Sequence, residues 1–138
     1  MLTQEQQTQY QRDGYIVLPD FKSADEIARL RRRAEDIVEA FDPAQLLADS
    51  RAIFTTRDQA RASDAWFLGS DNTVRCFFEE EAFDADGRLK QPKALSINKI
   101  GHAMHDLDPV FAAFTRDPKL AAVARDLGLL QSQVWQSM

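Results

Sequence analysis

One amphipathic helix constrains the fold of this chain more than any other feature of its sequence. Ser23 and Glu26 have the spacing of a capping box, in which the two side chains bond backbone N–H groups at the start of a helix. The apolar residues that follow recur at steps of three and four and therefore share one helical face: Ile27, Leu30, Ala34, Ile37, Val38 and Phe41. Because Pro43 closes this pattern, the sequence predicts a helix between Ser23 and Pro43.

Shorter elements are predicted on both sides of this helix. Thr3 and Gln6 form another capping box, so a helix should run to about Asp13 and stop at Gly14. A cap residue before proline predicts two later helices, one after Asp108-Pro109 and one covering about Pro118 to Leu127 and ended by Gly128. Runs rich in β-branched and aromatic residues predict strands at 15–18, 53–55 and 74–79, and a mixed polar and apolar run predicts another at 131–138. Residues 84–87 have the composition of a turn.

The charge balance disfavours a nucleic-acid binder. The 138 residues carry 17 basic and 22 acidic side chains, a net charge of −5, whereas duplex binders usually present a basic face. The densest basic cluster lies among acidic residues on the predicted long helix, which indicates a solvated, ion-paired face: Arg29, Arg31, Arg32 and Arg33. With 44% apolar residues, the composition is that of one globular domain.

The single cysteine and the N-terminal sequence indicate the cellular compartment of the protein. Cys76 has no partner for an internal disulfide and lies among apolar residues, which predicts a buried, inert thiol and suits a reducing cytosol. The sequence shows neither a signal peptide at its start nor an apolar run long enough to cross a membrane. We therefore expect a cytoplasmic protein with no membrane partner.

Two histidines are the candidate metal ligands. His102 and His105 are three residues apart, a spacing that places two side chains on one helical face, and Asp108 follows nearby. Imidazole and carboxylate groups suit iron or zinc. The alternative is that both rings hydrogen-bond locally at the start of a helix, and it is favoured because short motifs often match by chance.

Lys99 and Met138 carry little information taken alone. A lysine between Ile97 and Ile100 is usually exposed, with its stem lying on apolar surface, and a methionine is usually a gap-filler in a core. A chain that ends within a predicted strand should leave an unpaired edge and exposed apolar surface. We therefore expect the C-terminal strand to promote self-association.

Longer sequence segments predict a role for Lys99 and Met138. The segments Arg75–Glu79, Ser96–His102 and Gln136-Ser137-Met138 closely resemble the phytanoyl-CoA dioxygenase family, and the similarity runs from Gln11 to Met138. The resemblance implies an α+β fold in which N-terminal helices buttress a jelly-roll barrel, a double-stranded β-helix. It also implies a hydroxylase that uses iron(II) and 2-oxoglutarate, with a small-molecule or acyl substrate. In that family, residues at the positions of Lys99 and Met138 touch the 2-oxoglutarate.

The resemblance also implies what these 138 residues lack. The family's iron ligands, an H-x-D pair and a later histidine, follow the methionine, as does the arginine that grips the far carboxylate. We therefore expect residues 1–138 to be the N-terminal part of a single domain without its metal-bearing strands, to contain no catalytic or metal-binding residue, to bind neither cofactor tightly and to be inactive alone. The rival interpretations are a non-catalytic helical module that binds a protein partner and a small metal-binding protein built on His102 and His105.

Overall fold

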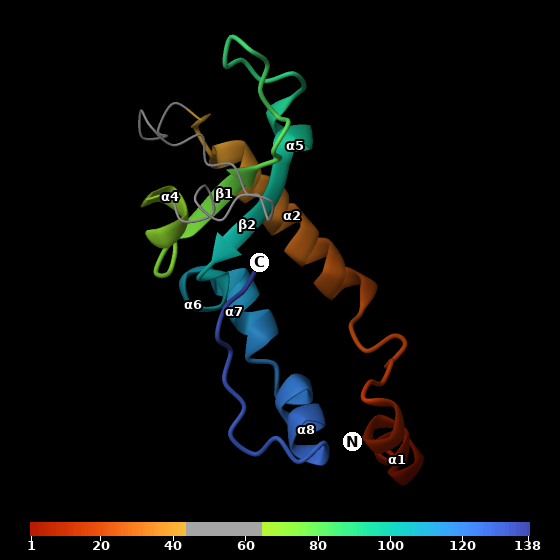
Figure 1. Cartoon of the computed structure of the whole chain (residues 1–138). Coiled ribbons are helices and arrows are strands. Elements are labelled where there is room, and N and C mark those ends of the chain that lie inside the picture. Colours follow the sequence, from red (N-terminus) through yellow and green to blue (C-terminus); the bar gives the residue numbers. More distant parts are fainter. Residues whose placement is uncertain (44–64) are drawn as a thin grey trace.

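The computed structural model describes residues 1–43 and 65–138 and combines helices with one small sheet (Figure 1). This mixture agrees with the predicted α+β class. The elements, in chain order, are α1 (Gln4–Asp13), α2 (Ala24–Ala40), α4 (Ala65–Leu68), β1 (Val74–Phe78), α5 (Lys93–Ser96), β2 (Ile97–His102), α6 (Met104–Leu107), α7 (Pro109–Thr115) and α8 (Pro118–Asp126).

The predicted helix starts are confirmed in atomic detail. The Ser23 hydroxyl accepts a hydrogen bond from the N–H of Glu26, and the Glu26 carboxylate accepts one from the N–H of Ser23. Thr3 and Gln6 form the same reciprocal pair before α1, and Gly14 ends that helix with a left-handed φ of 78°. Asp108 and Asp117 cap α7 and α8 in front of proline. Capping thus sets the start of each of these four helices.

The apolar face of α2 lies against the rest of the molecule, in contact with α5, α7 and β2. Leu30, Ala34, Ile37 and Val38 are half-buried, whereas Ile27 is 43% exposed. The helix ends at Ala40, and Phe41 follows in an extended conformation. The Phe41 ring contacts Phe78 of β1, with 5.7 Å between the ring centroids, and this contact joins the helix to the sheet.

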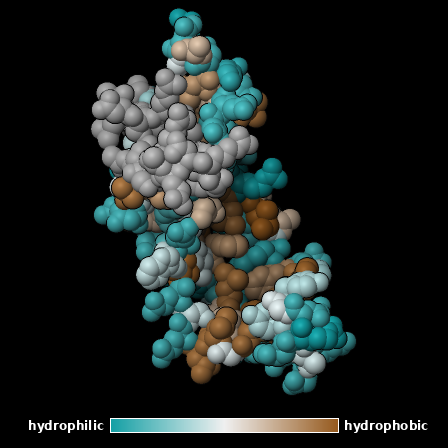
Figure 2. Space-filling model, in the orientation of Figure 1, coloured by the Kyte–Doolittle hydropathy of each residue, from teal (hydrophilic) through white to brown (hydrophobic). Residues whose placement is uncertain are grey.

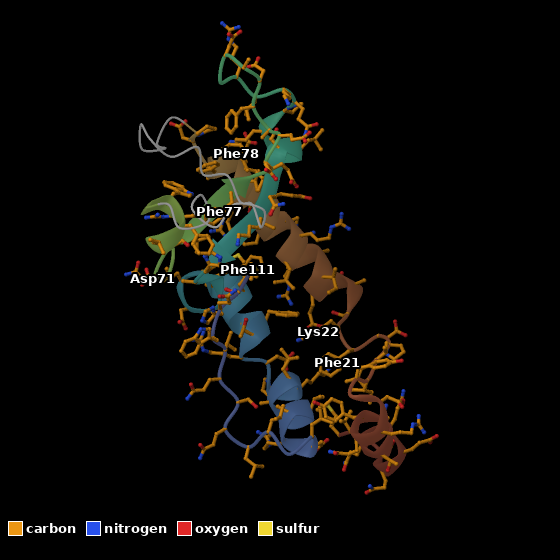
Figure 3. The ribbon with its side chains drawn as sticks, viewed as in Figure 1. Phe21, Lys22, Asp71, Phe77, Phe78 and Phe111 are labelled. Atoms are coloured by element: carbon orange, nitrogen blue, oxygen red, sulfur yellow. The ribbon has the colours of Figure 1, made fainter. Side chains whose placement is uncertain are left out.

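The sheet consists of β1 and β2 paired antiparallel, and it supplies the most deeply buried side chains. Phe77 and Phe78, side by side on β1, are both buried, and Phe78 forms a core cluster with Ala82 (Figure 3). The pairing is interrupted by a bulge, because Phe77 faces Lys99 while Phe78 faces Ile97. Asn98 is therefore the extra, unpaired residue of β2.

Two predicted strands are wrong and one lies outside the described residues. The run 15–18 belongs to no strand of the described residues, and it is exposed at Tyr15 and Val17. The run 131–138 is irregular and contributes one isolated bridge, from Ser137 to His102. The prediction at 53–55 falls within the undescribed range 44–64. The strand at 74–79 is confirmed as β1, and a turn at 84–87 is present with a positive φ at Gly87.

One ion pair corrects the expectation of a wholly solvated arginine cluster. The Arg33 Nε donates to Asp108 Oδ2 at 2.5 Å, and that carboxylate is only 3% exposed. Its other oxygen accepts from the N–H groups of Val110 and Phe111. Burial raises the pKa of Asp108, but these donors outweigh burial and lower it overall. Arg33 thus links α2 to α7, while Arg29, Arg31 and Arg32 are exposed as predicted.

No helix within residues 1–43 or 65–138 is both long enough and apolar enough to span a membrane.

We predict that Asp108→Ala destabilises the protein by about 2–4 kcal/mol, since it removes a helix cap and the partner of a half-buried arginine. Urea unfolding with an unchanged m-value measures the loss. Thr3→Ala is the matched control, because Thr3 caps α1 without an ion pair and should cost about 1 kcal/mol. Equal losses in the two variants would contradict a role for the ion pair.

The contribution of Asp108 should also depend on pH. Because its pKa is lower in the folded than in the unfolded protein, its stabilisation is full above the unfolded value of about 3.9 and is lost as pH falls below it. The difference in unfolding free energy between the wild type and Asp108→Ala should therefore shrink as the pH falls below about 4.

Candidate functional site

Lys99 lies beside two aromatic rings that also contact each other. It is on β2 directly opposite Phe77, and α4 places Phe67 on the same ammonium, so that the Nζ atom is 5.1 Å from each ring centroid. Both ring faces attract a cation. The side chain is half-buried, and burial lowers the pKa of Lys99. A partly dry setting of this kind strengthens the pairing of an ammonium with a carboxylate.

His102 contacts the same ammonium from the end of β2. Its Nε2 atom is 3.2 Å from Lys99 Nζ, and its Nδ1 atom is 2.7 Å from the hydroxyl of Ser70. The Ser70 hydroxyl donates to the carbonyl of Phe67 at 2.5 Å. Burial and then the charge of Lys99 lower the pKa of His102, which favours the neutral ring. The imidazole therefore bridges a buried serine and the lysine.

The C-terminal segment is attached to this cluster through Ser137. Its N–H and its hydroxyl both donate to the carbonyl of His102, at 3.0 and 3.1 Å. Its hydroxyl also bonds the N–H of His105 at 3.1 Å and the Nδ1 atom of that residue at 2.9 Å. These bonds bring the next residue, Met138, to the site, with its Sδ atom 4.0 Å from Lys99 Nζ. Lys99 and Met138, which are 39 positions apart, lie side by side.

The same geometry disfavours a metal site formed by His102 and His105. The expectation that His102 and His105 share one helix is wrong, because His102 ends β2 and His105 belongs to α6. Hydrogen bonds occupy both ring nitrogens of His102, and Asp108 is committed to Arg33. The hydrogen-bonding alternative describes both rings better, although their serine partners are 32 residues away. Residues 1–43 and 65–138 contain no group of three or more histidine, cysteine, aspartate or glutamate side chains that could hold a metal, so they do not fit an iron(II) centre.

Cys76 behaves as its apolar neighbours predict. The thiol is buried on β1, and burial raises its pKa to about 11, although Lys93 acts weakly in the opposite direction. A thiol with so high a pKa is protonated at neutral pH and is a poor nucleophile.

Sequence reasoning missed Ser70 and Phe67. Ser70 lies just after α4, in a weakly periodic stretch that predicts neither its burial nor its contact with a ring 32 residues later. Strict alternation along a strand would place Lys99 and His102 on opposite faces, because they are three residues apart. The structure instead brings them together where the chain leaves β2.

Comparisons with known proteins agree on one family. The family model described as "Phytanoyl-CoA dioxygenase (PhyH)" matches residues 10–138. A protein of Arabidopsis thaliana named "Phytanoyl-CoA dioxygenase" is 42% identical over 137 residues, which cover 99% of this chain and 47% of that protein. The "Phytanoyl-CoA dioxygenase domain-containing protein 1" of Bos taurus is 41% identical over 141 residues, with the same two shares. A Dictyostelium discoideum homologue of the latter is 37% identical over 128 residues, which cover 93% of this chain and 44% of that protein. The chain thus spans about half the length of the curated relatives it matches.

Proposed function

The chain belongs to the phytanoyl-CoA dioxygenase family, and from this premise we propose that it forms the N-terminal part of an iron(II)- and 2-oxoglutarate-dependent dioxygenase that hydroxylates a small-molecule or acyl substrate. The observation that carries the proposal is the Lys99 ammonium, held over a pair of aromatic rings and beside Met138. The complete enzyme would be cytoplasmic, and its catalytic domain a jelly-roll barrel that these helices support.

The part that we propose for Lys99 is to bind one carboxylate of 2-oxoglutarate. An ammonium carries a full charge and N–H donors only, so a carboxylate can pair with it beside the Nε2 atom of His102. Phe67 and Phe77 shield one side of the ammonium from water, so its pair with a carboxylate would form where screening is reduced.

Met138 would add an apolar wall to the same site. Its side chain is 66% exposed beside Lys99, so it offers an apolar contact for the carbon chain of a small ligand. In the complete enzyme, 2-oxoglutarate supplies the electrons for hydroxylation. The contribution proposed for the described residues is restricted to binding and orienting that cosubstrate, because they do not fit the iron.

We predict that the 138-residue chain alone neither binds iron(II) tightly nor converts 2-oxoglutarate to succinate, because its described residues offer no convergent set of three metal ligands. An anaerobic iron titration and a succinate assay measure the two properties. A His105→Gln chain serves as the control for weak binding to a single imidazole. Stoichiometric iron together with succinate production would contradict the restricted role proposed for this segment.

In the complete enzyme, Lys99→Met should weaken 2-oxoglutarate binding at least about tenfold. The variant keeps the apolar stem but removes the charge, and losing one partner of a buried charge pair costs roughly 2–5 kcal/mol, with about 1.4 kcal/mol per tenfold in affinity. Anaerobic titration with 2-oxoglutarate measures the change, and iron affinity and melting temperature should stay near their wild-type values.

Lys119→Met is the matched control, because Lys119 is an exposed lysine on α8. Its replacement should change the affinity by less than about 1 kcal/mol, as expected for a surface charge. If Lys99→Met behaves like Lys119→Met, Lys99 does not bind the cosubstrate.

A second candidate function, a module that binds a protein partner, is favoured by one surface. Leu130 is 78% exposed and Trp135 is 89% exposed in the C-terminal segment. Figure 2 shows hydrophobic residues gathered in the lower half of the view, where Figure 1 places α7, α8 and this segment. Contiguous apolar surface of this kind commonly marks an interface.

If this segment promotes self-association, the wild-type chain should dimerise or bind a hydrophobic dye, and the double variant Leu130→Ser, Trp135→Ser should reduce both. Sedimentation velocity and dye fluorescence measure the two effects. Leu95→Ser, at an exposed leucine on α5, is the control. A monodisperse wild-type monomer that binds no dye would contradict self-association through this segment.

A further inference from the structure

A continuous chain of hydrogen bonds ends on the Lys99 ammonium. The Ser70 hydroxyl donates to the Phe67 carbonyl at 2.5 Å, the Nδ1 atom of His102 lies 2.7 Å from that hydroxyl, and Lys99 Nζ lies 3.2 Å from Nε2. We propose that Ser70 and His102 are positioning residues that hold the Lys99 ammonium ready to receive a carboxylate of the cosubstrate. This inference rests on the proposed function, in which Lys99 binds 2-oxoglutarate.

The chain of bonds assigns the tautomer of His102. A serine hydroxyl has one hydrogen, and here that hydrogen is donated to the Phe67 carbonyl, so Ser70 can only accept from the imidazole. The proton of the neutral ring must then be on Nδ1, which leaves the lone pair of Nε2 to accept from Lys99. Ser70 and His102 are both buried, so water does not readily replace either partner.

The arrangement reduces the conformational cost of ligand binding at Lys99. A lysine side chain is flexible, and fixing it before the ligand arrives removes an ordering cost that binding would otherwise carry. Phe67 and Phe77 attract the ammonium without setting its direction, whereas the lone pair of a fixed imidazole is directional. The tautomer matters because a ring protonated on Nε2 would present a hydrogen to the ammonium and would repel it.

A purely structural role for His102 is the competing explanation. Its ring packs against Phe67 and Phe77, with centroid distances of 5.2 and 5.5 Å, so it could serve only to fill space. The two explanations predict opposite behaviour for two variants. His102→Phe keeps an aromatic ring but has no acceptor, whereas His102→Gln loses the ring and retains an amide oxygen that can accept from Lys99.

The first test measures the tautomer in the 138-residue chain, without ligand or turnover. Nitrogen-15 NMR of the imidazole should show His102 protonated on Nδ1 and unprotonated on Nε2 at neutral pH. Ser70→Ala removes the acceptor of the Nδ1 proton and should convert this single tautomer into a mixture. Ser132→Ala is the control, because Ser132 lies in the exposed C-terminal segment and bonds only the Leu129 carbonyl. A wild-type ring protonated on Nε2 overturns the proposal.

The second test measures anaerobic 2-oxoglutarate affinity in the complete enzyme. His102→Phe should weaken binding about tenfold, a loss typical of a hydrogen bond to a charged group, and His102→Gln should recover most of that loss. The double variant Lys99→Met, His102→Phe should bind no more weakly than Lys99→Met alone, because a positioning residue acts only through the lysine.

The outcomes separate this proposal from the function on which it rests. If Lys99→Met leaves the affinity unchanged, the proposed function fails, whatever the tautomer is. If Lys99→Met weakens binding but His102→Phe does not, or if the double variant shows additive losses, the function stands and the positioning role is overturned. If His102→Phe keeps the wild-type affinity for 2-oxoglutarate while His102→Gln weakens it, the ring only fills space. Should the His102 variants fail to fold, the wild-type tautomer still decides the proposal.

Discussion

The antiparallel pairing of β1 with β2 is the interaction on which the rest of the described structure depends. The pairing sets Phe77 opposite Lys99, which places an ammonium over an aromatic ring, and it sets Phe78 where Phe41 and Ala82 close around it. One strand pair thus supplies both the centre of the core and the centre of the candidate site. Two strands alone form a marginal sheet in water, so the helices that cover this pair are part of what keeps it in place.

Polar contacts join α2 to the helices α7 and α8. Arg33 connects α2 to the capping aspartate of α7, and Lys22 connects the start of α2 to Asp117, the cap of α8. Lys22 also lies over the ring of Phe114 of α7, with its Nζ atom 4.6 Å from the ring centroid. Each aspartate therefore both begins a helix and fixes that helix to α2. Changes at these two residues act on secondary structure and on tertiary packing together.

Local patterns predicted local structure well. The capping boxes, the proline-led helices and the strand at β1 depend on residues within a few positions of one another, and each was predicted from spacing alone. The strand expected at 15–18 failed because β propensity does not supply a partner strand. The candidate site was predicted only in part: family resemblance singled out Lys99 and Met138, and the structure places them together. Ser70 could not be found in this way, because its contact with His102 joins segments that share no periodic pattern.

The bulge at Asn98 has a consequence for how this segment tolerates changes in chain length. Since Asn98 stands outside the ladder between the Phe78–Ile97 and Phe77–Lys99 pairs, the backbone on its two sides is held in two separately anchored registers. A one-residue deletion at this position would be absorbed by regularising the ladder, and Lys99 would keep its place opposite Phe77. A deletion at Ile100 would also regularise the ladder, but Asn98 would then face Phe77 and Lys99 would move to the other face of the strand. Asn98 thus separates the start of β2 from the half of the strand that carries Lys99 and His102, so a deletion at the bulge need not move these two residues.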